Sequence, residues 1–246
     1  MRWERALSRL LRGQLPTGSG FRVSHALIAT CVVLFFMMIS HGILAGVGAR
    51  SILNPPIQLL QVWGGLVWIA VDHGQIWRCI TYAFAHGGLI HLAFNMLVLF
   101  QVGPLIEHEV GAARFLTLYT FCALTGSLAD YLWHPQVTVI GASSAIFGLI
   151  GFAALHYHRL GDVASLQRRN FMLQWAAFAF IFGLLVGADN AGHLGGLAGG
   201  ALFGAVMPVR GMFRPALNRL FQVLGGVSLL MIVGSLLGMF WWIIFS

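Results

Sequence analysis

Residues 223–245 read VLGGVSLLMIVGSLLGMFWWIIF, a stretch in which no side chain carries a charge. An apolar run of about 18 or more residues is long enough to cross the hydrocarbon core of a bilayer as an α-helix. A second charge-free stretch of this kind covers residues 26–44. These two stretches predict a protein that crosses the membrane.

The composition of the whole chain agrees with this prediction. Its 246 residues are 59% hydrophobic and only 9% charged, with a mean hydropathy of +0.85, whereas about 25% of the residues in a soluble domain are charged. This excludes a soluble enzyme, a disordered tail and a disulfide scaffold. Cys31, Cys79 and Cys122 lie far apart without a C-x-x-C pair, so we expect them to pack in the core rather than to bind a metal.

Seven apolar stretches are candidates for membrane-spanning helices. They cover residues 25–47, 87–106, 113–133, 140–157, 171–188, 191–208 and 219–245. The predicted fold class is therefore an all-α, polytopic bundle of membrane helices.

Residues 48–85 are the ambiguous part of this assignment. They contain Pro55-Pro56 and an apolar stretch of about 15 residues that ends at Val71, which is shorter than a full span. With seven spans and an inner N-terminus, every arginine except Arg50 and Arg78 lies on the inner side, as the positive-inside rule requires. An eighth span would move all arginines from Arg114 onward to the outside. We therefore expect residues 48–85 to form a large outer loop.

The same reading explains the net charge of +7 by membrane orientation, so no nucleic-acid partner is expected. It divides the chain into a cytoplasmic N-terminal segment (1–24), a six-helix core (25–209) and a C-terminal linker with a seventh membrane helix (210–246). No cleavable signal peptide is expected, because the first apolar stretch is too long for one.

Polar side chains inside membrane spans are costly and therefore indicate function. Counting 1.5 Å per residue from the inner end of each span brings four of them to one layer in the outer half of the membrane: His91, Asn95, Ser143 and His193. They converge because the second, fourth and sixth spans all run from outside to inside. We expect these four side chains to form one site.

A serine, two histidines and an asparagine at one depth are the residues that acyl transfer needs. A serine hydroxyl is a poor nucleophile until a neighbouring imidazole removes its proton, so Ser143 and His193 are the candidate pair. Backbone N–H groups at the start of the fourth span, with the side chains of His91 and Asn95, are candidate donors to the oxyanion.

A third, acidic member of the site is not evident from the sequence. Asp189 and Asp130 are the nearest acidic residues, and neither is clearly placed to orient the imidazole, so a dyad is expected. Phe147 lies one turn below Ser143 on the same helix face and could hold the imidazole of His193 by stacking.

Several separated motifs occur in a fixed order: Trp77-Arg78, His86-x4-His91-x3-Asn95, Gly141-x-Ser143 and His193-x2-Gly196-x3-Gly200. With these motifs, from the first to the sixth span, the chain resembles the rhomboid family of intramembrane serine proteases. The resemblance implies that Ser143 is the nucleophile, His193 the base, and His91 and Asn95 oxyanion donors. It also implies that His86 supports the site, that Gly141 frames the serine and that Trp77-Arg78 is structural.

Two features distinguish this chain within that resemblance. Ser144 stands where the family commonly has glycine, but adjacent helical residues point about 100° apart, so only one of the two serines can face His193. The seventh span, at the C-terminus, corresponds to the family's form with six core helices plus one.

The resemblance implies an endopeptidase that cleaves the transmembrane segments of other membrane proteins, without a metal, ATP or another cofactor. Its partners would be substrate proteins and the lipid bilayer, and its location a bacterial inner membrane. The alternative is an inactive rhomboid-like scaffold that binds membrane helices without cutting them. The sequence has no H-E-x-x-H, and Asp130 and Asp162 fall on opposite sides of the membrane, which argues against metalloprotease and aspartyl chemistry.

Overall fold

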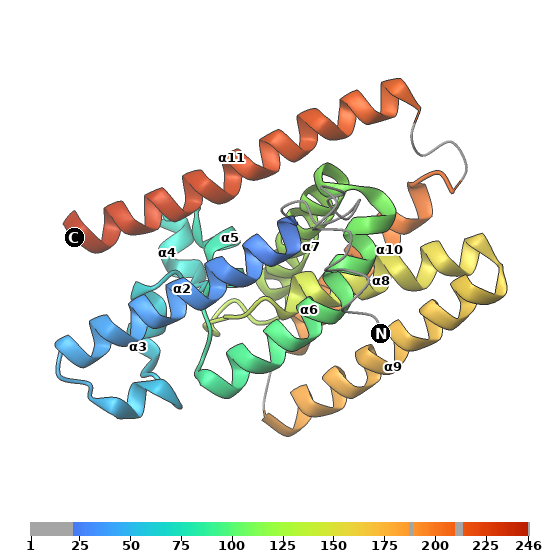
Figure 1. Cartoon of the computed structure of the whole chain (residues 1–246). Coiled ribbons are helices and arrows are strands. Elements are labelled where there is room, and N and C mark those ends of the chain that lie inside the picture. Colours follow the sequence, from blue (N-terminus) through green and yellow to red (C-terminus); the bar gives the residue numbers. More distant parts are fainter. Residues whose placement is uncertain (1–21, 187–188, 210–213, 246) are drawn as a thin grey trace, which may run out of the picture.

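The computed structural model describes residues 22–186, 189–209 and 214–245, and every regular element in these ranges is helical. The long helices are α2 (Val23–Leu44), α6 (Leu89–Val110), α7 (Ala112–Trp133), α8 (Ser143–Leu160), α9 (Val163–Val186), α10 (Asn190–Val206) and α11 (Pro215–Phe245). Each corresponds to one of the seven predicted spans, so the all-α fold class is confirmed. Figure 1 shows α9 and α11 at opposite edges of the bundle, with α8 between them.

The helix ends differ from the predicted span ends for local reasons. Helix α9 begins at Val163 rather than at residue 171, because its first turns carry polar and charged side chains that a charge-free apolar stretch does not include. Helix α6 continues beyond residue 106 to Val110, where Gly111 turns the chain with a φ of 87°. Helix α8 begins only at Ser143, because Gly141 has a φ of 113° and cannot belong to a right-handed helix.

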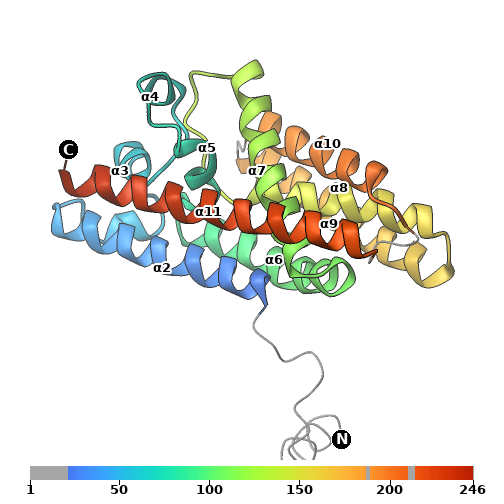
Figure 2. The same cartoon turned by 90° about the horizontal axis from the view of Figure 1, so that it is seen from above.

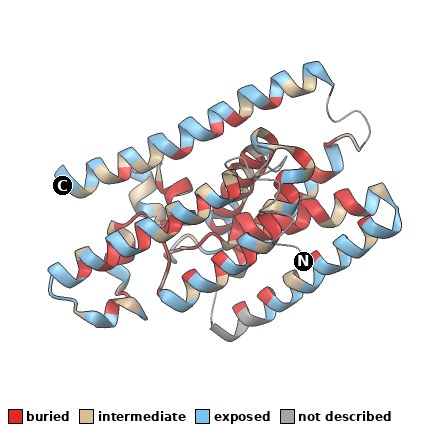
Figure 3. Ribbon diagram, viewed as in Figure 1, coloured by how far each residue is buried: buried red, intermediate tan, exposed pale blue. Residues whose placement is uncertain are grey.

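The exterior of the bundle is apolar, as a protein in lipid requires. By length and composition, α2, α6 and α11 are each able to cross a membrane. Large hydrophobic side chains such as Phe36, Phe100 and Leu230 are exposed on these helices. Figure 3 shows burial concentrated at the centre of the bundle, whereas α11 is pale along most of its length. The chain is a multi-pass membrane protein.

We call residues 45–88, between α2 and α6, the outer segment. Its short helices are η1 (Ala49–Ile52), α3 (Ile57–Val62), α4 (Trp68–Asp72), α5 (Arg78–Thr81) and η2 (Tyr82–Phe84). The six residues of α3 reach only about 9 Å along the helix axis, so the segment does not form an eighth span. Instead it is bonded internally: the buried guanidinium of Arg78 donates hydrogen bonds to the backbone carbonyls of Gln61 and Gly65 and to the Gln75 side chain.

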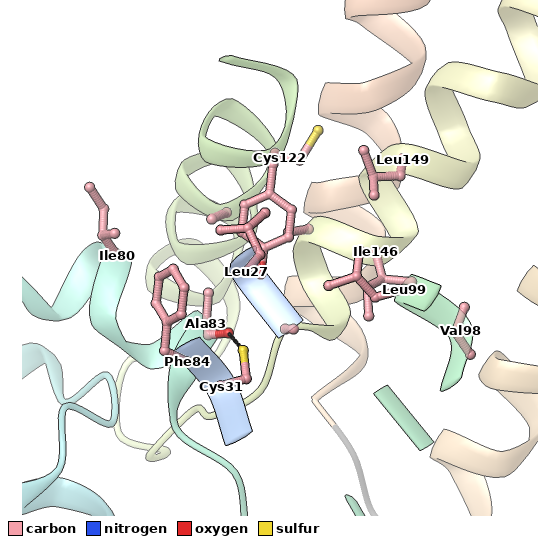
Figure 4. Close-up of a cluster of buried hydrophobic side chains, with 14 of the residues drawn as sticks. Leu27, Cys31, Ile80, Ala83, Phe84, Val98, Leu99, Cys122, Ile146 and Leu149 are labelled. Atoms are coloured by element: carbon pink, nitrogen blue, oxygen red, sulfur yellow. Dashed lines mark hydrogen bonds between the residues drawn. The ribbon is translucent and has the colours of Figure 1, made fainter. Parts of the chain in front are cut away.

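The core joins helices that are distant in sequence. Figure 4 shows Leu27 and Cys31 of α2 near Phe84 of η2, with Cys122 of α7 and Ile146 of α8 in the same cluster. The Cys31 thiol lies 4.0 Å from the carbonyl oxygen of Ala83. Because Ile146 belongs to this cluster, the first turn of α8 packs against α2, α7 and η2.

Helices α8 and α10 approach each other more closely than side chains would allow. A Cβ atom built at Gly196 of α10 would overlap the carbonyl oxygen of Ser144, and one built at Gly200 would overlap that of Gly148. Glycine at these two positions therefore brings the backbones of α8 and α10 into direct contact.

Polar groups fix the N-terminal ends of α2 and α11. The buried carboxylate of Glu107, in α6, accepts hydrogen bonds from the first backbone N–H groups of α2 at Val23 and Ser24. The guanidinium of Arg114, in α7, donates to the Asn218 side chain of α11 at 2.7 Å and lies over the ring of Phe221. Figures 1 and 2 show α2 and α11 running in roughly parallel directions.

Candidate active site

Ser143 is the first residue of α8, and the backbone before it is held in place. Gly141 has a φ of 113°, which favours glycine, and its N–H donates to the carbonyl of Tyr82 at 2.8 Å. Since the first N–H groups of a helix have no acceptor within the helix, the start of α8 is a local source of hydrogen-bond donors.

His193 lies in the first turn of α10, and the start of that helix is capped. The Asp189 side chain accepts hydrogen bonds from the N–H groups of Ala191 at 3.0 Å and Gly192 at 2.8 Å. The Nε2 atom of His193 lies 2.8 Å from the hydroxyl oxygen of Ser143. With the imidazole proton on Nδ1, the serine hydroxyl donates to Nε2, which is the geometry required for deprotonating Ser143.

The second ring nitrogen of His193 has no acidic partner among the described residues. Its Nδ1 atom is buried and makes no hydrogen bond there. The Asp189 carboxylate caps α10, and the Asp130 carboxylate accepts a hydrogen bond from Trp68 Nε1 at 2.7 Å. The Phe147 ring stacks on the imidazole, with 4.4 Å between ring centroids and 16° between planes. The ring of His193 is thus oriented by an aromatic face rather than by a carboxylate.

His91 and Asn95 lie on the first turns of α6. The Nδ1 atom of His91 accepts a hydrogen bond from the N–H of Gly87 at 3.3 Å, and its Nε2 atom faces Gly141. Asn95 is buried and its amide donates to the carbonyl oxygen of His91 at 2.9 Å. Both side chains therefore belong to the α6 side of the site.

A cavity of about 720 Å³ connects these groups. Ser143, His193, His91, Asn95 and Phe147 all line it. Much of the remaining wall is apolar and includes Ile90, Phe94, Val98, Ile140 and Ile146. A cavity of this size and character fits a short apolar piece of polypeptide beside the serine.

His86 lies apart from this cavity. It precedes α6, is fully buried, and its Nδ1 atom is 3.1 Å from the carbonyl oxygen of Phe84. Its ring contacts the ring of His91, with 5.4 Å between centroids. His86 thus contacts a wall residue of the cavity without lining the cavity itself.

The two adjacent serines face different neighbours. Ser144 is 2% exposed, and its hydroxyl lies where a Cβ atom built at Gly192 or at Gly126 would come within 3.0 Å. It therefore points between α7 and α10, while Ser143 points at His193.

Contacts between the outer segment and the residues before α8 were not foreseen from the sequence. Leu66 and Val139 form an antiparallel bridge with reciprocal backbone hydrogen bonds of 2.9 and 3.1 Å. The Gln61 amide also donates to the Thr138 hydroxyl at 2.9 Å. No charge pattern or motif pairs these residues, which lie more than seventy positions apart.

A model of the rhomboid domain matches residues 73–210, which is more than half of the chain. Rhomboid protease GluP of Bacillus subtilis is 32% identical over 200 residues, covering 77% of this chain and 36% of GluP.

RHOMBOID-like protein 7 of Arabidopsis thaliana is 30% identical over 170 residues, covering 67% of this chain and 54% of that protein. The putative rhomboid protease YdcA of Bacillus subtilis is 33% identical over 136 residues, covering 54% and 68% respectively. The match thus spans about a third of the length of GluP and about half of that of RHOMBOID-like protein 7. The extent of the domain match shows that the chain belongs to the rhomboid family.

Proposed function

We propose that the chain is an intramembrane serine endopeptidase that cleaves transmembrane segments of other membrane proteins. The observation that carries this proposal is the 2.8 Å contact between Ser143 Oγ and His193 Nε2 inside a cavity of a membrane-embedded bundle. The names of the two Bacillus subtilis relatives, which are given as proteases or putative proteases, support the same reaction class.

The reaction begins when the Ser143 oxygen attacks the carbonyl carbon of the scissile peptide and His193 Nε2 takes the hydroxyl proton. The tetrahedral intermediate collapses as the imidazolium returns that proton to the leaving amine, leaving an acyl ester on Ser143. A water molecule, deprotonated by His193, then attacks the ester. This step releases the carboxylic acid and restores the serine hydroxyl.

The negative oxygen of the tetrahedral intermediate needs donors. The N–H groups at the start of α8 and the side chains of His91 and Asn95 are the groups we assign to this role. His86 and Gly141 are assigned a supporting role, because His86 packs against His91 and Gly141 lets the chain turn into α8. Phe147 is assigned to hold the imidazole plane.

Substrates are expected to be transmembrane helices that unwind locally. A peptide bond inside a helix is already hydrogen-bonded and shielded, so it must leave the helix before a serine can attack it. Small or helix-breaking residues near the cut lower the cost of this step. Water must reach the same cavity for hydrolysis of the ester.

The proposed organisation keeps residues 25–209 as the protease core, with 1–24 on the cytoplasmic side and 210–246 as the linker and seventh helix. The distribution of arginines supports this orientation, and a bacterial inner membrane is the proposed location.

Cleavage of a model transmembrane substrate by the purified protein in detergent tests the proposal. Ser143→Ala and His193→Ala are each expected to abolish cleavage without changing the melting temperature by more than a few degrees. Ser144→Ala is the matched control, because it removes the neighbouring hydroxyl, and it is expected to retain most of the activity. Binding of the substrate without cleavage by the unaltered protein would instead indicate a scaffold.

A further inference from the structure

The residues that lead into α8 are held by the outer segment. We call residues 134–142, between α7 and α8, the serine loop. Three sets of contacts hold it: the Leu66–Val139 bridge, the hydrogen bond from Gln61 to Thr138, and the hydrogen bond from Gly141 to Tyr82. Ser143 follows this loop directly, so its position depends on where the outer segment lies.

The outer segment in turn packs on the C-terminal part of α11. The rings of Trp63 and Phe240 meet edge to face, with 6.0 Å between centroids and 88° between planes. Met239 is 1% exposed, and a Cβ atom built at Gly64 would lie 2.7 Å from its sulfur. Gly238 lies against the indole of Trp77, at a distance where a built Cβ atom would come within 3.3 Å.

These contacts occupy one side of α11 only. Leu237 and Trp241, which flank them in sequence, are 64% and 67% exposed. The N-terminal part of the same helix is fixed independently, by the Arg114–Asn218 hydrogen bond and by close contact of Gly225 with Ala113. Figures 1 and 2 both show α11 running from its N-terminal end past α7 to lie beside α5. The helix therefore connects the N-terminal end of α7 to the outer segment.

We infer that α11 positions the catalytic serine: Met239 and Phe240 hold Trp63 and Gly64, and the outer segment transmits this placement to the serine loop. They are positioning residues, since neither lines the cavity of Ser143 and His193. A displacement of a reacting group by about 1 Å can lower a rate on the order of a hundredfold, so loosening this chain of contacts acts on Ser143. The catalytic consequence rests on the proposed protease function, whereas the mechanical coupling does not.

Hydrogen exchange of backbone amides tests the coupling without reference to activity. In the full-length protein in detergent, the double variant Met239→Ala/Phe240→Ala is expected to speed exchange at Leu66 and Val139 by about tenfold or more. Leu237→Ala is the matched control on the exposed side of the same helix, and it is expected to leave both amides unchanged. The conservative double variant Met239→Leu/Phe240→Tyr keeps most of the buried volume. It is expected to retain most of the protection that the double alanine variant loses.

Steady-state kinetics on a model substrate then tests the catalytic consequence. The double alanine variant is expected to lower kcat by about tenfold with KM within about twofold, because the cavity walls remain while the serine is displaced. Unchanged exchange at Leu66 and Val139 in that variant would overturn the inference, whatever the activity. Faster exchange in a protein whose unaltered form cleaves nothing would uphold the coupling and refute the protease function instead.

Discussion

The contact between Phe147 and His193 determines how the imidazole of the candidate base is oriented. The imidazole has a buried Nδ1 atom that lacks a partner among the described residues, and a phenyl ring 4.4 Å away fixes its plane. An aromatic stack restrains tilt but leaves the proton on Nδ1 unbonded. An aromatic ring therefore sets the orientation of His193, whereas a carboxylate sets it in a triad.

Replacing Phe147 by leucine is expected to lower kcat about threefold to tenfold with a smaller change in KM, because an aromatic pair contributes about 0.5–1.5 kcal/mol beyond its buried area. Steady-state cleavage of a model substrate provides the measurement. Phe152→Leu is the matched control, since Phe152 stacks on His156 in the same helix at 5.1 Å between centroids. Equal losses in both variants would show that Phe147 acts only through stability.

Glu107 has a structural role at the scale of helices. Its carboxylate accepts from Val23 N at 2.7 Å, Ser24 N at 2.9 Å and Ser24 Oγ at 2.7 Å, so a side chain of α6 caps the start of α2. Loss of an N-terminal cap costs about 0.5–2 kcal/mol, and a buried donor that is left unpaired when the carboxylate is removed costs about 1–3 kcal/mol.

Glu107→Ala is therefore expected to lower the stability of the protein by about 2–4 kcal/mol, measured by thermal or denaturant unfolding in detergent. Glu109→Ala is the control, because Glu109 is partly exposed and pairs with Arg168 at 3.3 Å on the surface. Such exposed pairs contribute about 0–1 kcal/mol. A loss in Glu107→Ala no larger than in Glu109→Ala would contradict the capping role.

Asp162 caps α9 outside the membrane spans. Its two carboxylate oxygens accept from Ser165 Oγ at 2.6 Å and Ser165 N at 3.0 Å, and these bonds lower the pKa of the carboxyl group below its usual value. Because the folded-state pKa is lowered, the contribution of this group to stability is complete above the unfolded-state pKa of about 4. It is lost as the pH falls through the folded-state pKa.

Asp162→Asn is accordingly expected to weaken hydrogen-exchange protection at residues 165 and 166 at pH 6.5, and the difference from the unaltered protein should shrink toward pH 3. Both proteins are compared at each pH, so the intrinsic dependence of exchange on pH cancels. A difference that stays constant across this range would show that the charge of Asp162 does not contribute.

The sequence predicts the helical architecture of the whole molecule better than it predicts the contacts between distant segments. Seven charge-free apolar stretches predict the seven long helices, and a stretch too short to cross a bilayer predicts the outer segment. Ser143 and His193 can be predicted from their chemistry and their common depth, because the three helices that carry the site begin at the same face. These inferences need only the helical rise and the thickness of a bilayer.

The contacts that hold the serine loop could not be predicted in this way. The Leu66–Val139 bridge uses backbone groups, which every residue has, and the packing of Met239 on Gly64 depends on where two irregular segments meet. Such features arise from tertiary packing and leave no periodic signal.

If His193 activates Ser143 and not Ser144 as the nucleophile, a reagent that labels activated serines will distinguish the two residues. The intact protein in detergent is treated with a fluorophosphonate, and the modified residue is located by peptide mass spectrometry. We expect one modified serine, Ser143. Labelling is expected to be abolished in Ser143→Ala, strongly reduced in His193→Ala and retained in Ser144→Ala. Labelling at Ser144, or no labelling of the unaltered protein, would contradict the assignment of Ser143 as the nucleophile.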